Sequence, residues 1–211
     1  MNRPRRLVAV SAGLSLPSST RLLADRLAEA TARQLEWTDP STDVEITVVE
    51  LRQLAVDISK HLVTGFPPPA LRTALDAVTA ADALIVVTPV FNASYSGLFK
   101  SFFDVVERGA LDGKPVLTAA TGGTARHSLT LDHAVRPLFA HLRAATTPTA
   151  VFAAPEDWGA VGQNPADGLA ARIVRAGAEL ARLTTATPPA PAEESEVVSF
   201  EEQLAAIRPA Q

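Results

Sequence analysis

Hydroxyl groups crowd a short segment near the start of the chain. The first loop, residues 11–20, has the sequence SAGLSLPSST and leads into a stretch with helical spacing of apolar residues. Unpaired N–H groups and the dipole at a helix N-terminus favour an anion. The segment therefore predicts a phosphate site with hydroxyl donors at Ser11, Ser18, Ser19 and Thr20. Alternatively, Ser18 does no more than cap the helix.

Two familiar phosphate-binding patterns are absent from this first loop. It has no lysine followed by serine or threonine, so it is not the P-loop of a nucleoside triphosphatase. It also lacks the G-x-G-x-x-G pattern of a dinucleotide-binding fold.

Two further loops carry groups suited to a flat ligand. The second loop, residues 88–97, is TPVFNASYSG: its aromatic rings offer flat apolar surface, and Asn92 and nearby amides offer hydrogen bonds. Ser96 is expected to cap the next helix, and Gly97 allows close approach. The alternative is an ordinary turn in which Phe91 and Tyr95 close the edge of the core.

The third loop, residues 120–127, is ATGGTARH. Gly122 and Gly123 let backbone approach a ligand, Thr121 can hydrogen-bond to it, and Arg126 or His127 could meet a substrate phosphate. For these last two residues the alternative is a solvated position at the start of a helix.

Five apolar runs of strand length must position these loops. They cover residues 7–10, 44–49, 83–88, 115–120 and 147–153, and nearly continuous apolar strands indicate a parallel sheet covered on both faces. Stretches with helical spacing cover residues 18–34, 70–80, 96–108 (before Gly109), 128–143 and 164–183 (opening with Asn164 and Pro165).

Strands that alternate with helices predict a doubly wound α/β fold. In the flavodoxin-like order 2-1-3-4-5, loops after the first, third and fourth strands share one pocket. The three loops occupy those places. We place His133 and His141 on a helix and His61 in a loop. No pair of histidines has the spacing of metal ligands, so we expect no metal site.

The amino-acid composition excludes several kinds of catalytic and binding site. The chain has 211 residues, no cysteine and a net charge of −4, which excludes thiolate catalysis and iron–sulfur clusters. A pI near 5.6 argues against nucleic-acid binding. The apolar run after the N-terminal arginines is too short for a signal peptide or membrane span, so we expect a soluble cytoplasmic protein.

One domain is expected over residues 1–184. It is followed by a Pro/Ala/Glu-rich tail, 185–211, that could form a short helix over 199–207.

The loop sequences resemble those of the NADPH-dependent FMN reductase family of flavodoxin-like proteins, and more narrowly the reductases that partner luciferase-like monooxygenases. The matching pieces are GLSLPSSTRLLADRL (13–27), TPVFNASYSGLFKSFFD (88–104) and GKPVLTAATGGTARHSLTLDHAVRPLF (113–139). The resemblance spans residues 7–158.

The resemblance assigns an FMN site to the three loops. It implies that the phosphate binds at Ser11, Gly13, Ser18, Ser19 and Thr20. It implies that the isoalloxazine ring lies against Pro89, Val90, Phe91, Asn92, Tyr95, Ser96 and Gly97, with its other edge at Thr121, Gly122 and Gly123. Many relatives carry an arginine where this chain has Ser19. The helix after the second loop often makes dimer and tetramer contacts in the family; Phe99, Phe102 and Phe103 would serve there, although core packing explains them equally well.

The implied reaction transfers hydride from NADPH or NADH to FMN, so no side-chain acid, base or nucleophile is expected. Reduced FMN would then serve a monooxygenase.

One alternative of the same fold is an enzyme that keeps FMN bound and reduces quinones, azo dyes or metal oxyanions. Another is a flavodoxin-type electron carrier, which would be more acidic and richer in aromatic residues. A phospho-acceptor domain needs acidic residues after the first strand, where Ser11 and Ala12 stand.

Overall fold

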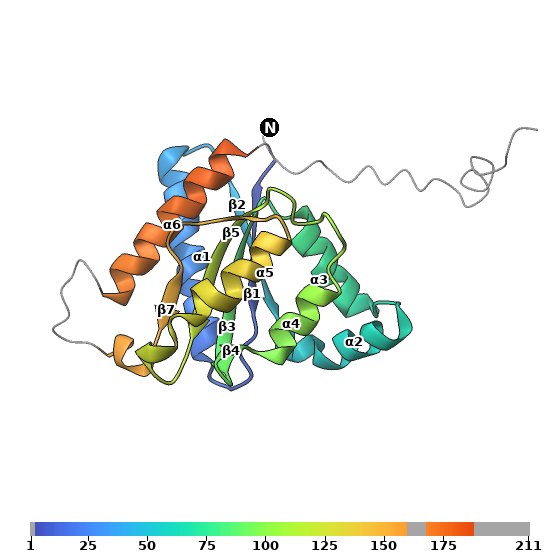
Figure 1. Cartoon of the computed structure of the whole chain (residues 1–211). Helices are drawn as coiled ribbons and strands as arrows, with labels where there is room; N and C mark the ends of the chain where they lie inside the picture. Colours follow the sequence, from blue (N-terminus) through green and yellow to red (C-terminus); the bar gives the residue numbers. More distant parts are fainter. Residues whose placement is uncertain (1–2, 160–167, 188–211) are drawn as a thin grey trace, which may run out of the picture.

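The computed structural model describes residues 3–159 and 168–187 and has a parallel sheet at its centre (Figure 1). The strand order is β2-β1-β3-β5-β6, with β7 also parallel to β5. The parallel strands are β1 (Arg5–Ser11), β2 (Val44–Glu50), β3 (Ala83–Phe91), β5 (Pro115–Thr121), β6 (Ala145–Thr146) and β7 (Val151–Ala153). The predicted order is confirmed, with β5 as the fourth strand and β6 and β7 together in place of the fifth.

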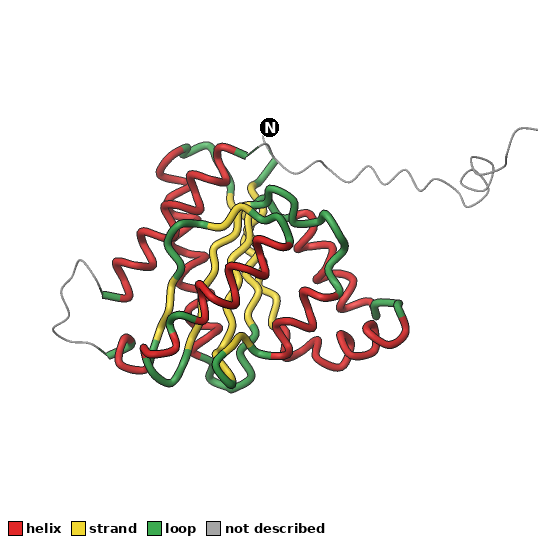
Figure 2. Tube along the Cα trace, viewed as in Figure 1, coloured by secondary structure: helices red, strands yellow, loops and turns green. Residues whose placement is uncertain are grey.

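Helices cover both faces of the sheet (Figure 2). One face packs against α1 (Ser19–Thr38) and α6 (Leu169–Ala186). The other packs against α2 (Leu51–Thr64), α3 (Pro69–Ala80), α4 (Gly97–Asp104) and α5 (Arg136–His141). This arrangement confirms the doubly wound flavodoxin-like prediction and explains why the central strands are apolar along their whole length.

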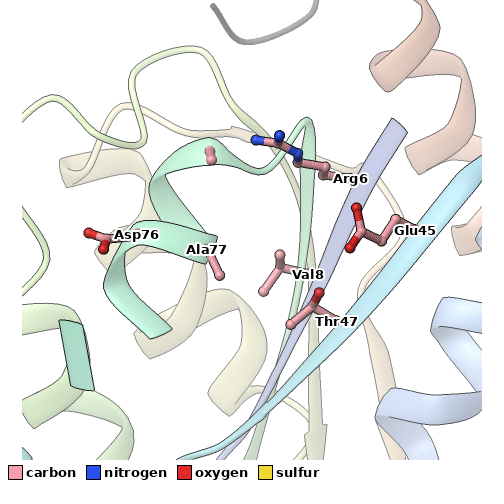
Figure 3. A pocket seen from close by; sticks show the side chains of 7 residues that line it. Arg6, Val8, Glu45, Thr47, Asp76 and Ala77 are labelled. Carbon is pink, nitrogen blue, oxygen red and sulfur yellow. The ribbon is translucent and has the colours of Figure 1, made fainter. Parts of the chain in front are cut away.

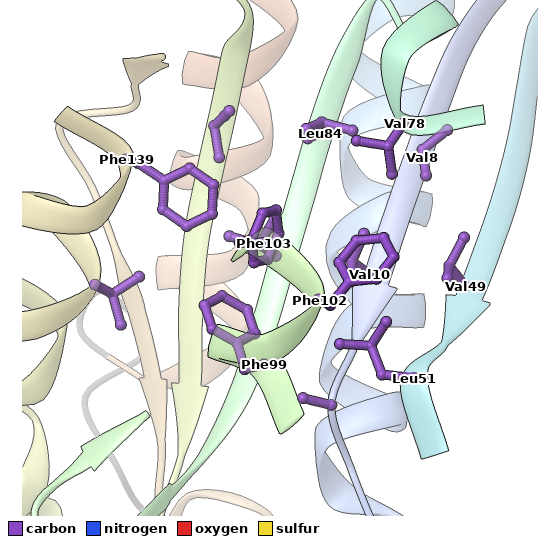
Figure 4. Close-up of a cluster of buried hydrophobic side chains, with 14 of the residues drawn as sticks. Val8, Val10, Val49, Leu51, Val78, Leu84, Phe99, Phe102, Phe103 and Phe139 are labelled. Atoms are coloured by element: carbon purple, nitrogen blue, oxygen red, sulfur yellow. The ribbon is translucent and has the colours of Figure 1, made fainter. Parts of the chain in front are cut away.

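Side chains of each strand alternate between two cores. In β1, Leu7 packs toward α1 and α6, whereas Val8 packs toward the other helices. The second core contains the aromatic cluster of Figure 4, formed by Phe99, Phe102, Phe103 and Phe139. The three phenylalanines of α4 are at most 3% exposed, so they pack in the core instead of offering surface to a second copy.

The expected strand over residues 147–153 is interrupted. Thr147 still donates its amide to Val116 O, but Pro148 has no N–H, and the amide of Thr149 bonds to Glu179 Oε2 of α6 at 2.7 Å. The chain therefore leaves β5 and rejoins it only at β7. A second difference is β4 (Ser94–Tyr95), which pairs antiparallel with β3 inside the second loop.

Helix α2 is absent from the prediction, and placing His61 in a loop was wrong because it lies in the last turn of this helix. Leu51 and Ile58 are buried, and Leu54 packs beside them. Their spacing of three and four residues could have identified the helix. It ends at Gly65, whose φ is +75°.

Two helices differ in their bounds from those expected. Helix α4 ends at Asp104 and not at residue 108, because the chain tightens as Val105 N–H bonds to Phe102 O; Gly109 belongs to a later turn. The expected helix over 128–143 is a π-helical turn, Leu131–Val135, followed by α5. Pro137 cannot donate to the carbonyl four residues earlier, and Arg136 N–H reaches back five residues instead.

Some expectations fall outside the described residues. Asn164 and Pro165, at the expected start of the last helix, and the possible helix over 199–207 belong to this group. The domain boundary near residue 184 stays a prediction. In the described part of the chain, no helix combines the length and the apolar character needed to cross a membrane.

Lys114, which directly precedes β5, caps the end of α3. Its Nζ donates to the carbonyl oxygens of Val78, Thr79 and Ala81 at 3.0, 2.6 and 2.9 Å. Burial lowers the pKa of Lys114 to about 8, against the charge of Asp82, which raises it. The ammonium group thus provides one donor for each of three carbonyl groups at the helix end.

Lys114→Met should lower the free energy of unfolding at pH 7 by about 2 kcal/mol, because buried carbonyl groups lose their donor. Between pH 8 and 10.5, the free energy of unfolding of the wild type should also rise relative to that of the variant. In this range Lys114 keeps its proton in the unfolded chain and has released it in the folded chain, so a higher pH favours the folded state. Urea denaturation of both proteins at several pH values measures this. Parallel pH profiles would show that Lys114 does not titrate as its burial implies.

Candidate functional site

The first loop folds back tightly on itself. Ala12 N–H donates to Val87 O at 2.9 Å, which fixes the start of the loop beside β3. A Cβ atom added to Gly13 would lie 2.1 Å from Ser18 Oγ and 3.0 Å from Thr20 Cβ. This turn therefore requires glycine.

The loop ends at the N-terminus of α1. Ser18 Oγ accepts a hydrogen bond from Arg21 N at 3.2 Å, so its side chain caps the helix. Helix capping is the alternative role considered for this residue. The amides of Ser19 and Thr20 are in the first helical turn, and none of the hydrogen bonds among described residues uses them. They are donors suited to an anion.

The arginine closest to this loop in sequence is engaged elsewhere. Arg21 Nε donates to Asp25 Oδ1 at 2.8 Å, and its Nη1 donates to Glu50 Oε1 at 2.6 Å. The hydrogen bond to Asp25, helped by Glu50, raises the pKa of Arg21 above its ordinary value. The guanidinium group is held against two carboxylates and is not free to neutralise a phosphate.

The second loop is a β-hairpin whose two aromatic rings lie apart. Val90 pairs with Tyr95 and Phe91 with Ser94, and successive residues of a strand face opposite sides. The Tyr95 ring packs toward the core, with its centroid 5.9 Å from that of Phe99. Phe91 is 46% exposed. Of the two rings, Phe91 is therefore the more exposed.

The hairpin is held by two threonines that the sequence analysis did not single out. Thr88 Oγ1 accepts from Ser96 N at 3.0 Å and donates to Pro89 O at 2.9 Å, closing the base of the loop. Thr130 Oγ1 donates to Ala93 O at 3.4 Å near its tip. Ser96 caps α4, as expected, by accepting from the Phe99 amide. Neither threonine belongs to a sequence motif, because each bonds through its hydroxyl to backbone atoms of the loop.

The turn of the hairpin contains an unfavourable residue. Asn92 and Ala93 have φ angles of +49° and +63°, and this left-handed region costs alanine about 1 kcal/mol. Ala93→Gly should therefore raise the free energy of unfolding by about 0.5 kcal/mol after the greater entropy of unfolded glycine is subtracted. Thermal denaturation measures the change, and a lower melting temperature would contradict the assignment of strain to this turn.

The third loop leaves β5 beside β7. Gly122 N–H donates to Ala153 O at 3.2 Å, and a Cβ atom at Gly122 would lie 2.8 Å from the Phe152 ring. Gly123 has open space around it. Arg126 and His127 are exposed in a single 3₁₀ turn, Ala125–His127. Both side chains are accessible, and no hydrogen bond or ion pair among the described residues orders them.

A buried hydrogen bond joins the first and third loops. Thr20 Oγ1 and Thr121 Oγ1 are 2.8 Å apart, although 101 positions separate them in sequence. With the hairpin of the second loop between β3 and α4, all three loops lie at the carboxyl edge of the sheet, the lower edge in Figure 1. This is where open α/β sheets bind ligands. The three loops thus lie at one edge of the sheet, as the predicted strand order requires, and their shared pocket stays a prediction.

One cavity of the described surface is separate from these loops. The cavity of about 330 Å³ in Figure 3 lies between the sheet and α3, and its lining includes Arg6, Glu45, Thr47 and Asp76. It contains no residue of the three loops. No group of three or more His, Asp or Glu side chains suited to a metal occurs within residues 3–159 and 168–187.

Comparison with known proteins decides the family. The model of the family described as NADPH-dependent FMN reductase matches residues 5–159. The chain belongs to this family. The match covers every described strand of the sheet and all three loops, and the chain is an NAD(P)H:FMN oxidoreductase.

Curated FMN reductases and a solved structure agree with this assignment. An FMN reductase (NADPH) of Pseudomonas aeruginosa is 39% identical over 75% of this chain and 81% of its own length. The NADH-dependent FMN reductase SfnE of Pseudomonas putida is 40% identical over 72% of this chain and 78% of its own. An oxidoreductase structure from Corynebacterium diphtheriae superposes with a TM-score of 0.82 and 43% identity, covering 89% of this chain and all of the other.

Proposed function

We propose that this FMN reductase binds FMN across the three loops, reduces it with NADPH or NADH, and releases reduced FMN to a two-component flavin monooxygenase. The observation that supports the site is the Thr20–Thr121 hydrogen bond, which joins the N-terminus of α1, with its two amides unpaired among the described residues, to the strand end before the glycine pair. Family membership supplies the reaction.

The first loop fits a phosphate. Its amides at Ser19 and Thr20 are unpaired among the described residues, and the space at Gly13 cannot hold a side chain. Their partial positive charge adds to that of the helix end. We assign the phosphate to Ser11, Gly13, Ser18, Ser19 and Thr20.

The second and third loops fit a flat ring. We assign its surroundings to Pro89, Val90, Phe91, Asn92, Tyr95, Ser96, Gly97, Thr121, Gly122 and Gly123. When bound, FMN supplies the hydride acceptor. The protein orients the two substrates and provides backbone N–H donors, which favour the negative charge that develops in hydride transfer. Arg126 and His127, both exposed beside the glycine pair, are assigned to the NAD(P)H phosphates.

The charge of the first loop supports the release of FMN after reduction. Within residues 11–20 there is no lysine or arginine, and the guanidinium of Arg21 is held by Asp25 and Glu50. The phosphate therefore meets neutral donors only, which hold an anion less tightly than a charge-assisted pair. Weak retention is what a reductase that passes its flavin to another enzyme needs.

Retention of the flavin tests this proposal. The protein is mixed with FMN, turned over with NADPH, and passed through a desalting column. We expect the flavin to separate from the protein, and a flavin-dependent monooxygenase supplied with only NADPH, FMN and this chain to turn over. Stoichiometric flavin retained through turnover, with faster reduction of a quinone than of free FMN, would instead identify a quinone reductase. If the protein fails to oxidise NADPH, the remaining interpretation is a flavodoxin-type electron carrier.

We also propose a cytoplasmic homodimer or homotetramer, since NAD(P)H is a cytoplasmic reductant. The end of α2 supports the oligomer: Val63 and the nearby Phe66 are 87% and 79% exposed, apolar surface that a second copy would cover. Sedimentation of the protein with and without Val63→Asp tests this. A monomeric wild-type protein would contradict it.

A further inference from the structure

Thr20 and Thr121 are buried, unlike the two serines that precede Thr20. They are 3% and 5% exposed, whereas Ser18 is half-buried and Ser19 exposed. Their Oγ1 atoms are 2.8 Å apart, so one hydroxyl donates to the other. A buried hydroxyl that already has a partner has less capacity to meet a ligand.

Each threonine stands next to a ligand-facing part of the backbone. Thr20 is the second residue of α1, the helix whose first amides we assign to the phosphate. Thr121 is the last residue of β5 and directly precedes Gly122 and Gly123. Among the hydrogen bonds of the described residues, theirs is the one that joins the first loop directly to the third.

We propose that Thr20 and Thr121 are positioning residues, whose hydroxyl–hydroxyl bond sets the spacing between the amides of the α1 N-terminus and the backbone of the glycine pair. This inference rests on the proposed FMN site. The bond holds two loops from different elements as one unit, so that the phosphate and the ring of one FMN molecule meet donors already in place.

The proposal differs from direct contact in how the two hydroxyls combine. If each hydroxyl touches FMN independently, their removals should add in free energy. If they act only through each other, removing one hydroxyl already breaks the connection. Removing the second then weakens binding no further, and it also removes the unpaired buried hydroxyl that the single variant leaves.

The test compares Thr20→Val, Thr121→Val and the double variant in the full chain, with FMN binding measured by quenching of flavin fluorescence. Each single variant should weaken binding about fivefold, and the double variant should show the same loss of about fivefold. Thr121→Ser keeps the hydroxyl and should bind like the wild type. The matched control is Thr31→Val, a buried threonine of α1 whose hydroxyl donates only to Leu27 O; it should lower the melting temperature without changing the FMN Kd.

The outcomes separate this inference from the proposed function. A loss of about 25-fold in the double variant would overturn it in favour of direct contact. Single variants that melt at a lower temperature but bind FMN like the wild type would overturn it in favour of a purely structural bond. If the wild-type chain itself fails to bind FMN, the proposed site fails, and this inference with it.

Discussion

Gly13→Ala should reduce kcat/KM for FMN by about a hundredfold while the chain stays folded. The new Cβ atom would lie 2.1 Å from Ser18 Oγ and 3.0 Å from Thr20 Cβ, so the loop must shift and the α1 cap is displaced. The amides assigned to the phosphate would move with it. The cost in stability is expected to be only that of a helix cap, about 1 kcal/mol.

Steady-state kinetics at varied FMN concentration, together with thermal denaturation, measure this effect. Gly159→Ala is the matched control, because a Cβ atom at Gly159 meets nothing within 4 Å and this exposed residue is outside the assigned site. The control should behave like the wild type. If Gly13→Ala retains the wild-type kcat/KM, the first loop does not hold the phosphate.

The second large effect concerns the aromatic core beneath the second loop. Phe99 is fully buried, and its ring centroid is 4.8 Å from that of Phe103 and 5.9 Å from that of Tyr95. Phe99→Ala should therefore lower the free energy of unfolding by about 4 kcal/mol. Urea denaturation measures the loss.

Trp37→Ala provides the comparison for this core position. A large aromatic ring is removed there from a side chain that is 85% exposed and outside the proposed oligomer surface, so the free energy of unfolding should change by less than about 1 kcal/mol. Equal losses at the two positions would contradict the core role of Phe99, and a Phe99→Ala protein that dissociates without losing stability would show that α4 supports an interface instead.

Much of the fold could be predicted because apolar strands and amphipathic helices carry strong periodic signals. The run at residues 83–88 became β3, and the apolar positions of α1 and α3 are buried as their spacing requires. The prediction missed α2 although its apolar spacing was present, and it failed in two further places where a proline removes a hydrogen bond. Pro148 interrupts the last strand and Pro137 widens a helical turn, and these local effects do not alter the hydrophobic pattern.

The candidate site could be predicted in its parts but not in its connections. Hydroxyl and glycine residues marked the three loops, because their types alone suggest anion binding and close approach. The hairpin that turns Tyr95 toward Phe99 depends on the register of β4, which a two-residue strand does not reveal. The pairing of Thr20 with Thr121, and of Thr88 with the backbone at Ser96, depends on the tertiary fold.

Family membership shows that this chain is an FMN reductase, and we propose that it binds and releases FMN as a substrate. Stopped-flow oxidation of NADPH, followed at 340 nm with and without added FMN, tests it most directly. We expect negligible oxidation by the flavin-free protein and a rate that rises and saturates as FMN is added. NADPH oxidation that does not depend on added FMN, or none in its presence, would contradict it.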